Sequence, residues 1–344
     1  MKRASVILLA ISLLLTLSAC SNGTSTHSAS LTDSPTAPHI ITRRGPGLTE
    51  IPLEGNELRS ANQIAVDASG TAYVACMYLY DAEHKIFEYK ILKADGLNEA
   101  YPIIEGLEYC CGLSVVDDAL YVFEARERDD GLLEYFTLTY DFRGELLDSA
   151  LVELGTFDAP VFYDVRVFQN TPIAIFLSRQ PTAEVPTYVY NLESGELATT
   201  EVTYEQGYGR KVLVTLSDGM TVVLEEHLPG WESFGPIIDI INVSADIGQT
   251  IQEALGGSLD ARNLTAIDIN TETGYLIEDA GNSTSELFII TDEGKSHVMS
   301  LPYDFIEIRP LSMHCVDQQL YFLVSNTDEG IKLITVGIPD ELAA

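Results

Sequence analysis

Carboxylates that follow short apolar runs are the first candidates for chemistry in this chain. Glu124, Glu225 and Glu278 each stand at or near the end of such a run, where a loop is expected to begin. If they converge, their oxygens suit Ca²⁺, which takes about six to eight oxygen ligands at roughly 2.3–2.6 Å. The six histidines, His227 among them, form no H-x-x-H or H-E-x-x-H pattern, and the cysteines form no C-x-x-C. We therefore predict no metal site and no resident cofactor, with Ca²⁺ as the one ion these side chains suit.

No serine or cysteine stands in the context of an activated nucleophile, so the sequence predicts no catalytic residue. Tyrosines and arginines recur instead where loops are expected, and such residues often anchor binding surfaces. Ordinary loop composition is the alternative explanation. The only tryptophan, Trp231, is expected either in a lid or partner contact, or in a plug over a sheet edge. The candidate binding rim comprises Tyr78, Glu124, Arg126, Tyr163, Arg179, Tyr208, Arg210, Glu225, His227, Trp231 and Glu278.

Three cysteines are candidates for a disulfide. Cys110 and Cys111 are adjacent, and Cys76 ends an apolar run in the preceding part of the chain. We expect Cys76 to pair with Cys110 or Cys111, with a vicinal Cys110–Cys111 bridge and four reduced thiols as the alternatives. Cys315 lies within an apolar run and is expected to be a buried free thiol.

The first twenty residues carry a targeting pattern. Lys2 and Arg3 precede an apolar run, Val6 to Leu17, which is followed by Leu17-Ser18-Ala19-Cys20. This order resembles a bacterial lipoprotein signal, which implies cleavage before Cys20 and lipidation of its thiol. The alternative, a transmembrane helix, is disfavoured because the run is shorter than the roughly 20 residues that span a bilayer. We expect a signal peptide at 1–19, a Ser/Thr/Pro-rich lipidated tether at 20–44 and a folded domain at 45–344.

The resemblance places the domain on the extracytoplasmic face of a cell membrane, held there by its lipid. It leaves open whether this is an inner, outer or sole membrane. The chain has 52 acidic and 19 basic residues, for a net charge of −33. Such a charge repels nucleic acid, which is therefore excluded as a partner, and favours cations or cationic partners. Solubility outside the cytoplasm is the simpler explanation of the same charge.

The chain repeats itself about every 50 residues. Six segments read as β-hairpins of two apolar strands, and the turns within them begin near residues 67, 117, 168, 216, 268 and 317. A third strand and a glycine-containing turn follow most of them, as at Asp95-Gly96 and Arg143-Gly144. Four antiparallel strands per unit is the pattern of a propeller blade. We predict an all-β fold, a six-bladed β-propeller with four-stranded antiparallel blades.

The two ends of the domain complement each other. The last unit ends at its third strand, Ile331 to Val336, whereas Gly47 to Leu53 precedes the first hairpin and lacks a blade of its own. Pairing these segments would close the last blade with the N-terminal strand and remove an exposed edge. A pair of β-sandwiches is the competing fold, but it does not explain the repeat.

The stretch from Asn62 to Ala75 resembles an NHL-type propeller repeat, and the whole arrangement resembles six-bladed TolB-like propellers. The resemblance implies a fold and little about activity. We expect a membrane-anchored lipoprotein whose propeller binds or scaffolds a protein or small-molecule ligand. The alternative is a propeller enzyme, a lyase or metal-dependent lactonase, that uses the axial face.

Overall fold

The computed structural model is built entirely of antiparallel β-sheets where it can be described. It describes residues 48–53, 57–81, 83, 86–95, 99–155, 160–167, 173–178, 185–200, 202–205, 209–215, 221–227, 237–238, 264–268, 273–279, 284–291, 294–303, 308–316, 318–326 and 330–339. Within these ranges there is no helix with the length and hydropathy of a membrane span. The predicted signal peptide and tether lie outside the described residues.

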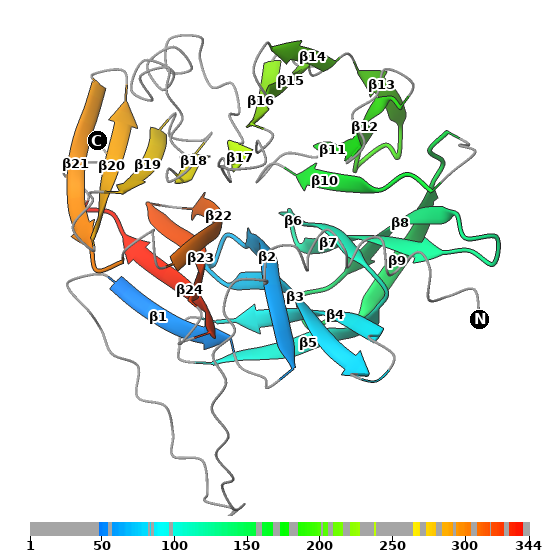
Figure 1. Ribbon diagram of the computed structural model, residues 1–344, viewed down its shortest axis with the longest axis horizontal. Helices are drawn as coiled ribbons and strands as arrows, with labels where there is room; N and C mark the ends of the chain where they lie inside the picture. The colour runs from blue at the N-terminus through cyan, green and yellow to red at the C-terminus, as the bar shows by residue number, and fades with distance from the viewer. Residues whose placement is uncertain are drawn as a thin grey trace, which may run out of the picture.

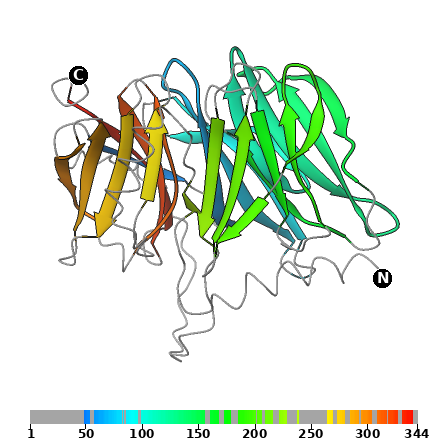
Figure 2. The same ribbon diagram turned by 90° about the horizontal axis from the view of Figure 1, so that it is seen from above.

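The described strands form six sheets of four strands each. Figure 1 shows the sheets following one another around a centre, and Figure 2 shows neighbouring sheets standing side by side. Three sheets come from the first half of the domain: β2 (Leu58–Val66), β3 (Ala72–Asp81), β4 (Ile86–Ala94) and β5 (Ala100–Leu107); β6 (Cys110–Val116), β7 (Ala119–Glu127), β8 (Leu133–Tyr140) and β9 (Leu146–Val152); and β10 (Tyr163–Val167), β11 (Ile173–Ser178), β12 (Thr187–Asn191) and β13 (Leu197–Thr200).

The other three sheets come from the second half and from the N-terminal strand. They are β14 (Val202–Glu205), β15 (Gly209–Thr215), β16 (Thr221–His227) and β17 (Ile237–Ile238); β18 (Leu264–Asp268), β19 (Thr273–Asp279), β20 (Ser285–Thr291) and β21 (Gly294–Leu301); and β22 (Ile308–Val316), β23 (Gln319–Asn326), β24 (Gly330–Gly337) and β1 (Leu48–Leu53).

The hairpins predicted from the repeat correspond to paired strands: β2–β3, β6–β7, β10–β11, β15–β16, β18–β19 and β22–β23. One unit differs from the expectation. Its sheet begins with β14, so the hairpin β15–β16 supplies the second and third strands instead of the first two. β14 is formed by a short Val-Thr-Tyr run. A hairpin signal needs only two strong strands, and β15 and β16 already supply them, so the repeat did not reveal β14.

The first and last described strands lie side by side. β1 pairs antiparallel with β24, from Leu48 opposite Val336 to Leu53 opposite Ile331. Tyr303 donates a hydrogen bond from its hydroxyl to Glu50 Oε1 (2.8 Å), and Lys332 Nζ contacts Glu50 Oε2 at 3.2 Å. This buried carboxylate therefore links β1 to β24 and to the segment before β22.

Apolar layers between neighbouring sheets form the core. One layer joins the β2–β5 sheet to the β6–β9 sheet, and another joins the β6–β9 sheet to the β10–β13 sheet. Gly112 of β6 lies in a close contact of the second layer, because a Cβ there would stand 2.7 Å from Cβ of Val165 and 2.9 Å from Phe123. These layers fix the ends of β7, β8, β9 and β10, from which the site described below is built.

Candidate functional site

Glu124, a predicted rim carboxylate that is more buried than Glu278, has hydrogen-bond and ion-pair partners within the protein. It lies in β7 with 2 % of its surface exposed. Oε2 accepts hydrogen bonds from Nε (2.7 Å) and pairs with Nη2 (2.6 Å) of Arg126, while Oε1 accepts the backbone N–H of Glu108 at 2.8 Å. The Arg126 guanidinium in turn lies over the Phe136 ring, 4.5 Å from its centroid. Glu124 and Arg126 are thus brought together as an ion pair with a buried carboxylate, and the bond from the Glu108 N–H ties the segment before β6 to β7.

Glu278 lies on a different sheet and has a different partner. Its Oε1 is 2.7 Å from Lys295 Nζ, and this ammonium stands 4.0 Å from the centroid of Phe288. The structure therefore does not bring Glu124 and Glu278 to one place. Among the described residues, no three His, Cys, Asp or Glu side chains are grouped so that they could hold a metal ion.

Tyr78 and Tyr163 of the predicted rim serve packing. Lys90 Nζ lies over the Tyr78 ring at 5.4 Å, and burial raises the pKa of the Tyr78 hydroxyl. Tyr163 is 1 % exposed, and its hydroxyl donates to the carbonyl of Pro186 at 3.2 Å. Its ring meets that of Tyr135 edge to face at 5.6 Å. Tyr163 therefore forms a rigid wall, with its hydroxyl already engaged.

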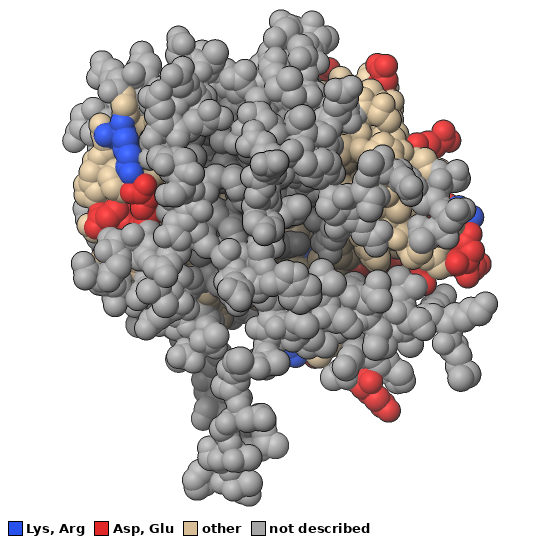
Figure 3. Space-filling model, turned by 45° about the horizontal axis from the view of Figure 1, so that its top comes forward, with Lys and Arg blue, Asp and Glu red and all other residues tan. Residues whose placement is uncertain are grey.

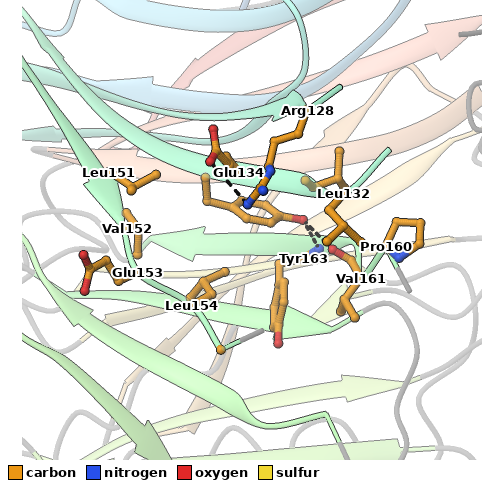
Figure 4. A pocket seen from close by; sticks show the side chains of 13 residues that line it. Arg128, Leu132, Glu134, Leu151, Val152, Glu153, Leu154, Pro160, Val161 and Tyr163 are labelled. Atoms are coloured by element: carbon orange, nitrogen blue, oxygen red, sulfur yellow. Dashed lines mark hydrogen bonds and ion pairs between the residues drawn. The ribbon is translucent and has the colours of Figure 1, made fainter. Parts of the chain in front are cut away.

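A cavity of about 330 Å³ opens beside that wall, between the β6–β9 and β10–β13 sheets. Figure 4 shows Val161 and Tyr163 among the side chains that line it. The Tyr135 hydroxyl donates to the Val161 carbonyl (2.9 Å) and accepts from the Tyr163 N–H (2.8 Å). The segment after β7, the start of β8, the end of β9 and the start of β10 meet here. The lining residues are Arg128, Leu132, Leu133, Glu134, Tyr135, Leu151, Val152, Glu153, Leu154, Gly155, Pro160, Val161 and Tyr163.

The cavity mixes leucine side chains with charged groups at its mouth. Arg128 Nη2 is 3.0 Å from Asp130 Oδ2, and Nη1 is 3.7 Å from Glu134 Oε1. Glu153 is exposed and makes no ion pair with another described residue. The charge of Arg128 is thus already neutralised by Asp130 and Glu134, and the mouth keeps an excess of negative charge. This arrangement can bind a ligand with an apolar stem and a cationic group.

Sequence reasoning identified Tyr163 but missed the cavity beside it. Leu132, Leu133 and Leu154 are separated by some twenty residues, and only the pairing of Tyr135 with Val152 brings them together. A local signal did exist, since these leucines stand in stretches that are otherwise acidic: Arg-Asp-Asp-Gly before Leu132, and Glu153 before Leu154.

The four described cysteines are not joined by disulfides, which differs from the disulfide expected. Cys110 and Cys111 are successive strand residues, so they point to opposite faces of the β6–β9 sheet and belong to different apolar layers. Cys110 Sγ donates to the carbonyl of Gly112 and Cys111 Sγ to that of Phe123. Burial raises the pKa of Cys76 and raises that of Cys110 to about 12.

Several predicted site residues have no described side chain. Arg210 lies in β15, and Glu225 and His227 lie in β16, but only their backbones are described. Cys20, Arg179, Tyr208 and Trp231 lie outside the described residues.

No protein-family model and no curated protein matches the chain. Solved structures similar to it are β-propeller folds. The β-propeller domain of the trilobed protease from Pyrococcus furiosus is 13 % identical (TM-score 0.38; 80 % of this chain, 81 % of that one). A neuraminidase-like protein from A/bat/Guatemala/164/2009 is 11 % identical (0.41; 86 % and 93 %), and the GH43_1 enzyme from Xanthomonas citri complexed with xylotriose is 10 % identical (0.39; 85 % and 92 %). At these values the similarity concerns the fold, and no activity passes from these proteins to this chain.

Proposed function

We propose that this chain is a lipid-anchored extracytoplasmic binding protein. Its domain is a six-bladed β-propeller of the NHL/TolB-like kind, in which the N-terminal strand closes the last blade. The six four-stranded sheets and the β1–β24 pairing support this architecture. The Leu17–Cys20 motif supports lipidation of Cys20 and retention at a membrane surface.

The observation that carries the binding role is the cavity beside Tyr163. It combines leucine side chains and Tyr163 with a charged mouth in which Arg128 is paired with Asp130, and ligand sites combine apolar surface with a few polar groups in this way. A lyase or lactonase reaction needs acid–base or metal-ligating groups that converge on one point. In the described part of the chain, the carboxylates of Glu124 and Glu278 are engaged in separate ion pairs instead. Binding is therefore the better-supported function, and its ligand is a protein segment or a small molecule.

Anchoring is tested by metabolic labelling with a palmitate analogue. The Cys20→Ser variant should lose the label and leave the membrane fraction, whereas Ser21→Ala, which keeps the thiol, should behave as wild type. Labelling that survives Cys20→Ser would rule out this anchor.

Binding is tested by panning a random-peptide phage library against the purified full chain. Leu132→Trp should fill the cavity and abolish enrichment. Ile86→Trp adds the same ring at a position that is 42 % exposed in the β3–β4 hairpin, and it should leave enrichment intact. The absence of any enrichment, or enrichment equal in wild type and Leu132→Trp, would contradict a binding role for this cavity.

A further inference from the structure

The outer strand of the β6–β9 sheet presents an apolar edge. β9 is the terminal strand of its sheet, and three of its leucines are largely exposed: Leu146 at 54 %, Leu147 at 60 % and Leu151 at 49 %. Natural sheets protect such edges with charged residues, proline or very short strands. Over its seven residues β9 has no lysine and no proline, and its one charged residue, Asp148, is acidic. By comparison, the outer strand β5 contains Pro102, and β21 carries Lys295 and His297.

The edge is continuous with the cavity. Leu151 and Val152 belong to β9, and both line the cavity, as do Glu153 and Leu154 immediately after the strand. A chain laid along β9 would therefore run directly to the mouth beside Tyr163. Seven residues of strand span about 23 Å, which an extended octapeptide matches.

The charge of this surface selects the occupant. Figure 3 shows more acidic than basic side chains among the described residues on the right-hand side, where β8 and β9 lie in Figure 1. Arg128 is already paired, and Arg143 stands at the far end of the edge, before β9. The acidic residues along the edge and mouth are Asp130, Glu134, Glu145, Asp148 and Glu153.

A second copy of the chain fits the same edge poorly. Two copies could pair antiparallel with their Ser149 residues opposite one another. In this register Leu147 of each copy lies opposite Leu151 of the other, and the two Asp148 residues do not face each other. The same register also sets Glu145 opposite Glu153 at both ends, and like charges directly opposite one another are destabilising. The net charge of −33 on each copy adds to the repulsion.

Resting on the proposed binding function, we propose that β9 and the adjoining cavity bind an extended basic peptide segment of a protein partner by strand addition. Backbone groups of the peptide pair with the edge of β9, and its apolar side chains pack on the exposed leucines. A lysine or arginine at one end enters the cavity mouth, with its stem on Leu154 and its charge near Glu153. Recognition by added strands draws affinity from the backbone and specificity from side chains, as this surface requires.

The test uses fluorescein-labelled octapeptides and fluorescence anisotropy with the full chain. The probe alternates Lys and Val four times. A Glu-Val peptide of the same length tests the sign of the charge, and a Lys-Pro peptide keeps the charge but lacks half of the backbone donors. We expect Lys-Val to bind, Glu-Val and Lys-Pro to bind at least about tenfold more weakly, and the Lys-Val affinity to fall steeply with added salt.

Two matched variants locate the site. Leu147→Lys places a charge on the exposed edge, where the fold tolerates it, and should weaken Lys-Val binding by about tenfold or more. Tyr101→Lys makes an equivalent change at a position that is 43 % exposed on β5 and should leave binding unchanged. Equal effects of the two variants, or equal binding of Lys-Pro and Lys-Val, would overturn strand addition at β9. A concentration-dependent dimer that Leu147→Lys abolishes would assign the edge to a second copy and overturn the proposal as well.

The outcome separates this inference from the binding function itself. If Lys-Val fails while peptides selected by panning still depend on Leu132, the cavity is a binding site but its ligand is not a basic strand. If neither binds, both proposals fail.

Discussion

Removal of β1 is the perturbation that most directly tests how this domain is held together. A chain that begins after Leu53 loses the six residue pairs that β1 forms with β24, whereas a chain that begins after Arg44 keeps them all. If the N-terminal strand closes the last blade, the first truncation should unfold the domain or bring it close to unfolding. The second truncation should leave stability unchanged.

The magnitude follows from what β1 buries. Leu48, Ile51 and Leu53 are 1 %, 2 % and 5 % exposed. Full burial of such a side chain contributes roughly 1.5–3 kcal/mol, so the three together contribute about 5–9 kcal/mol. Removal of Glu50 also leaves the Lys332 ammonium and the Tyr303 hydroxyl without this partner, which adds a desolvation cost. Since whole domains are stable by about 5–15 kcal/mol, the loss is comparable with the total.

Urea unfolding followed by circular dichroism measures this directly, and point variants keep the test informative if the shorter chain fails to fold. Ile51→Ala should lower the free energy of unfolding by about 2–5 kcal/mol, whereas Thr49→Ala, at a half-buried position of the same strand, should cost less than about 1 kcal/mol. Glu50→Gln should cost less than Glu50→Ala, because the amide oxygen can still accept from Tyr303. Equal midpoints for the two truncations, together with a neutral Ile51→Ala, would refute the reasoning.

Three further predictions follow from single positions. Gly144 has φ +84°, and a Cβ there would collide with the Ile103 carbonyl oxygen. Gly144→Ala should therefore lower the free energy of unfolding by about 3 kcal/mol or more. Gly131→Ala, where φ is +83° and the space is open, should cost about 1 kcal/mol, and thermal unfolding compares the two. Burial lowers the pKa of His314 to about 4, below its ordinary value near 6.5, so the stability of the neutral form is lost as pH falls from about 6.5 toward 4. The stability difference between wild type and His314→Gln should shift against wild type by about 3 kcal/mol over that range, and an unchanged difference would contradict this. Thiol titration should find four reactive groups besides Cys20 after denaturation without reductant and almost none before it, because the thiols are buried; two groups would restore the disulfide expected from the sequence.

The fold was largely predictable because each repeat contains two apolar strands and a turn that can be recognised in the sequence. Asp67 illustrates why: its carboxylate accepts the N–H groups of Ser69 and Thr71, and the Asp-x-x-Gly spacing needed for this turn is visible in the sequence. The β1–β24 pairing was predictable from an unmatched strand at each end. β14 was not predictable, since its four residues carry no turn signal, and the sheet takes it up only through pairing with β15.

The candidate site was harder to predict because side-chain roles depend on partners from other strands. From the sequence, Glu124 looked like a carboxylate available to a cation, but the adjacent arginine and the Glu108 N–H occupy its oxygens. Tyr163 looked like an exposed anchor, yet its ring is buried against Tyr135 because β10 begins inside the apolar layer. A period of about 50 residues fixes which strand a residue belongs to, but not whether its end of the strand is covered by the next sheet.

The same reasoning explains why the cavity and the β9 edge are the surfaces where binding is expected. A residue on an inner strand is covered by sheets on both sides, so its polar atoms must find partners within the protein, as those of Glu124 do. The polar atoms of a residue on an outer strand can bond to water instead, and an exposed leucine there contributes no apolar burial to the stability of the fold. Leu146, Leu147 and Leu151 lie on one outer strand that ends at the cavity mouth. Folding therefore leaves their apolar surface uncovered beside a cavity mouth where a partner could bury it together with a cationic group.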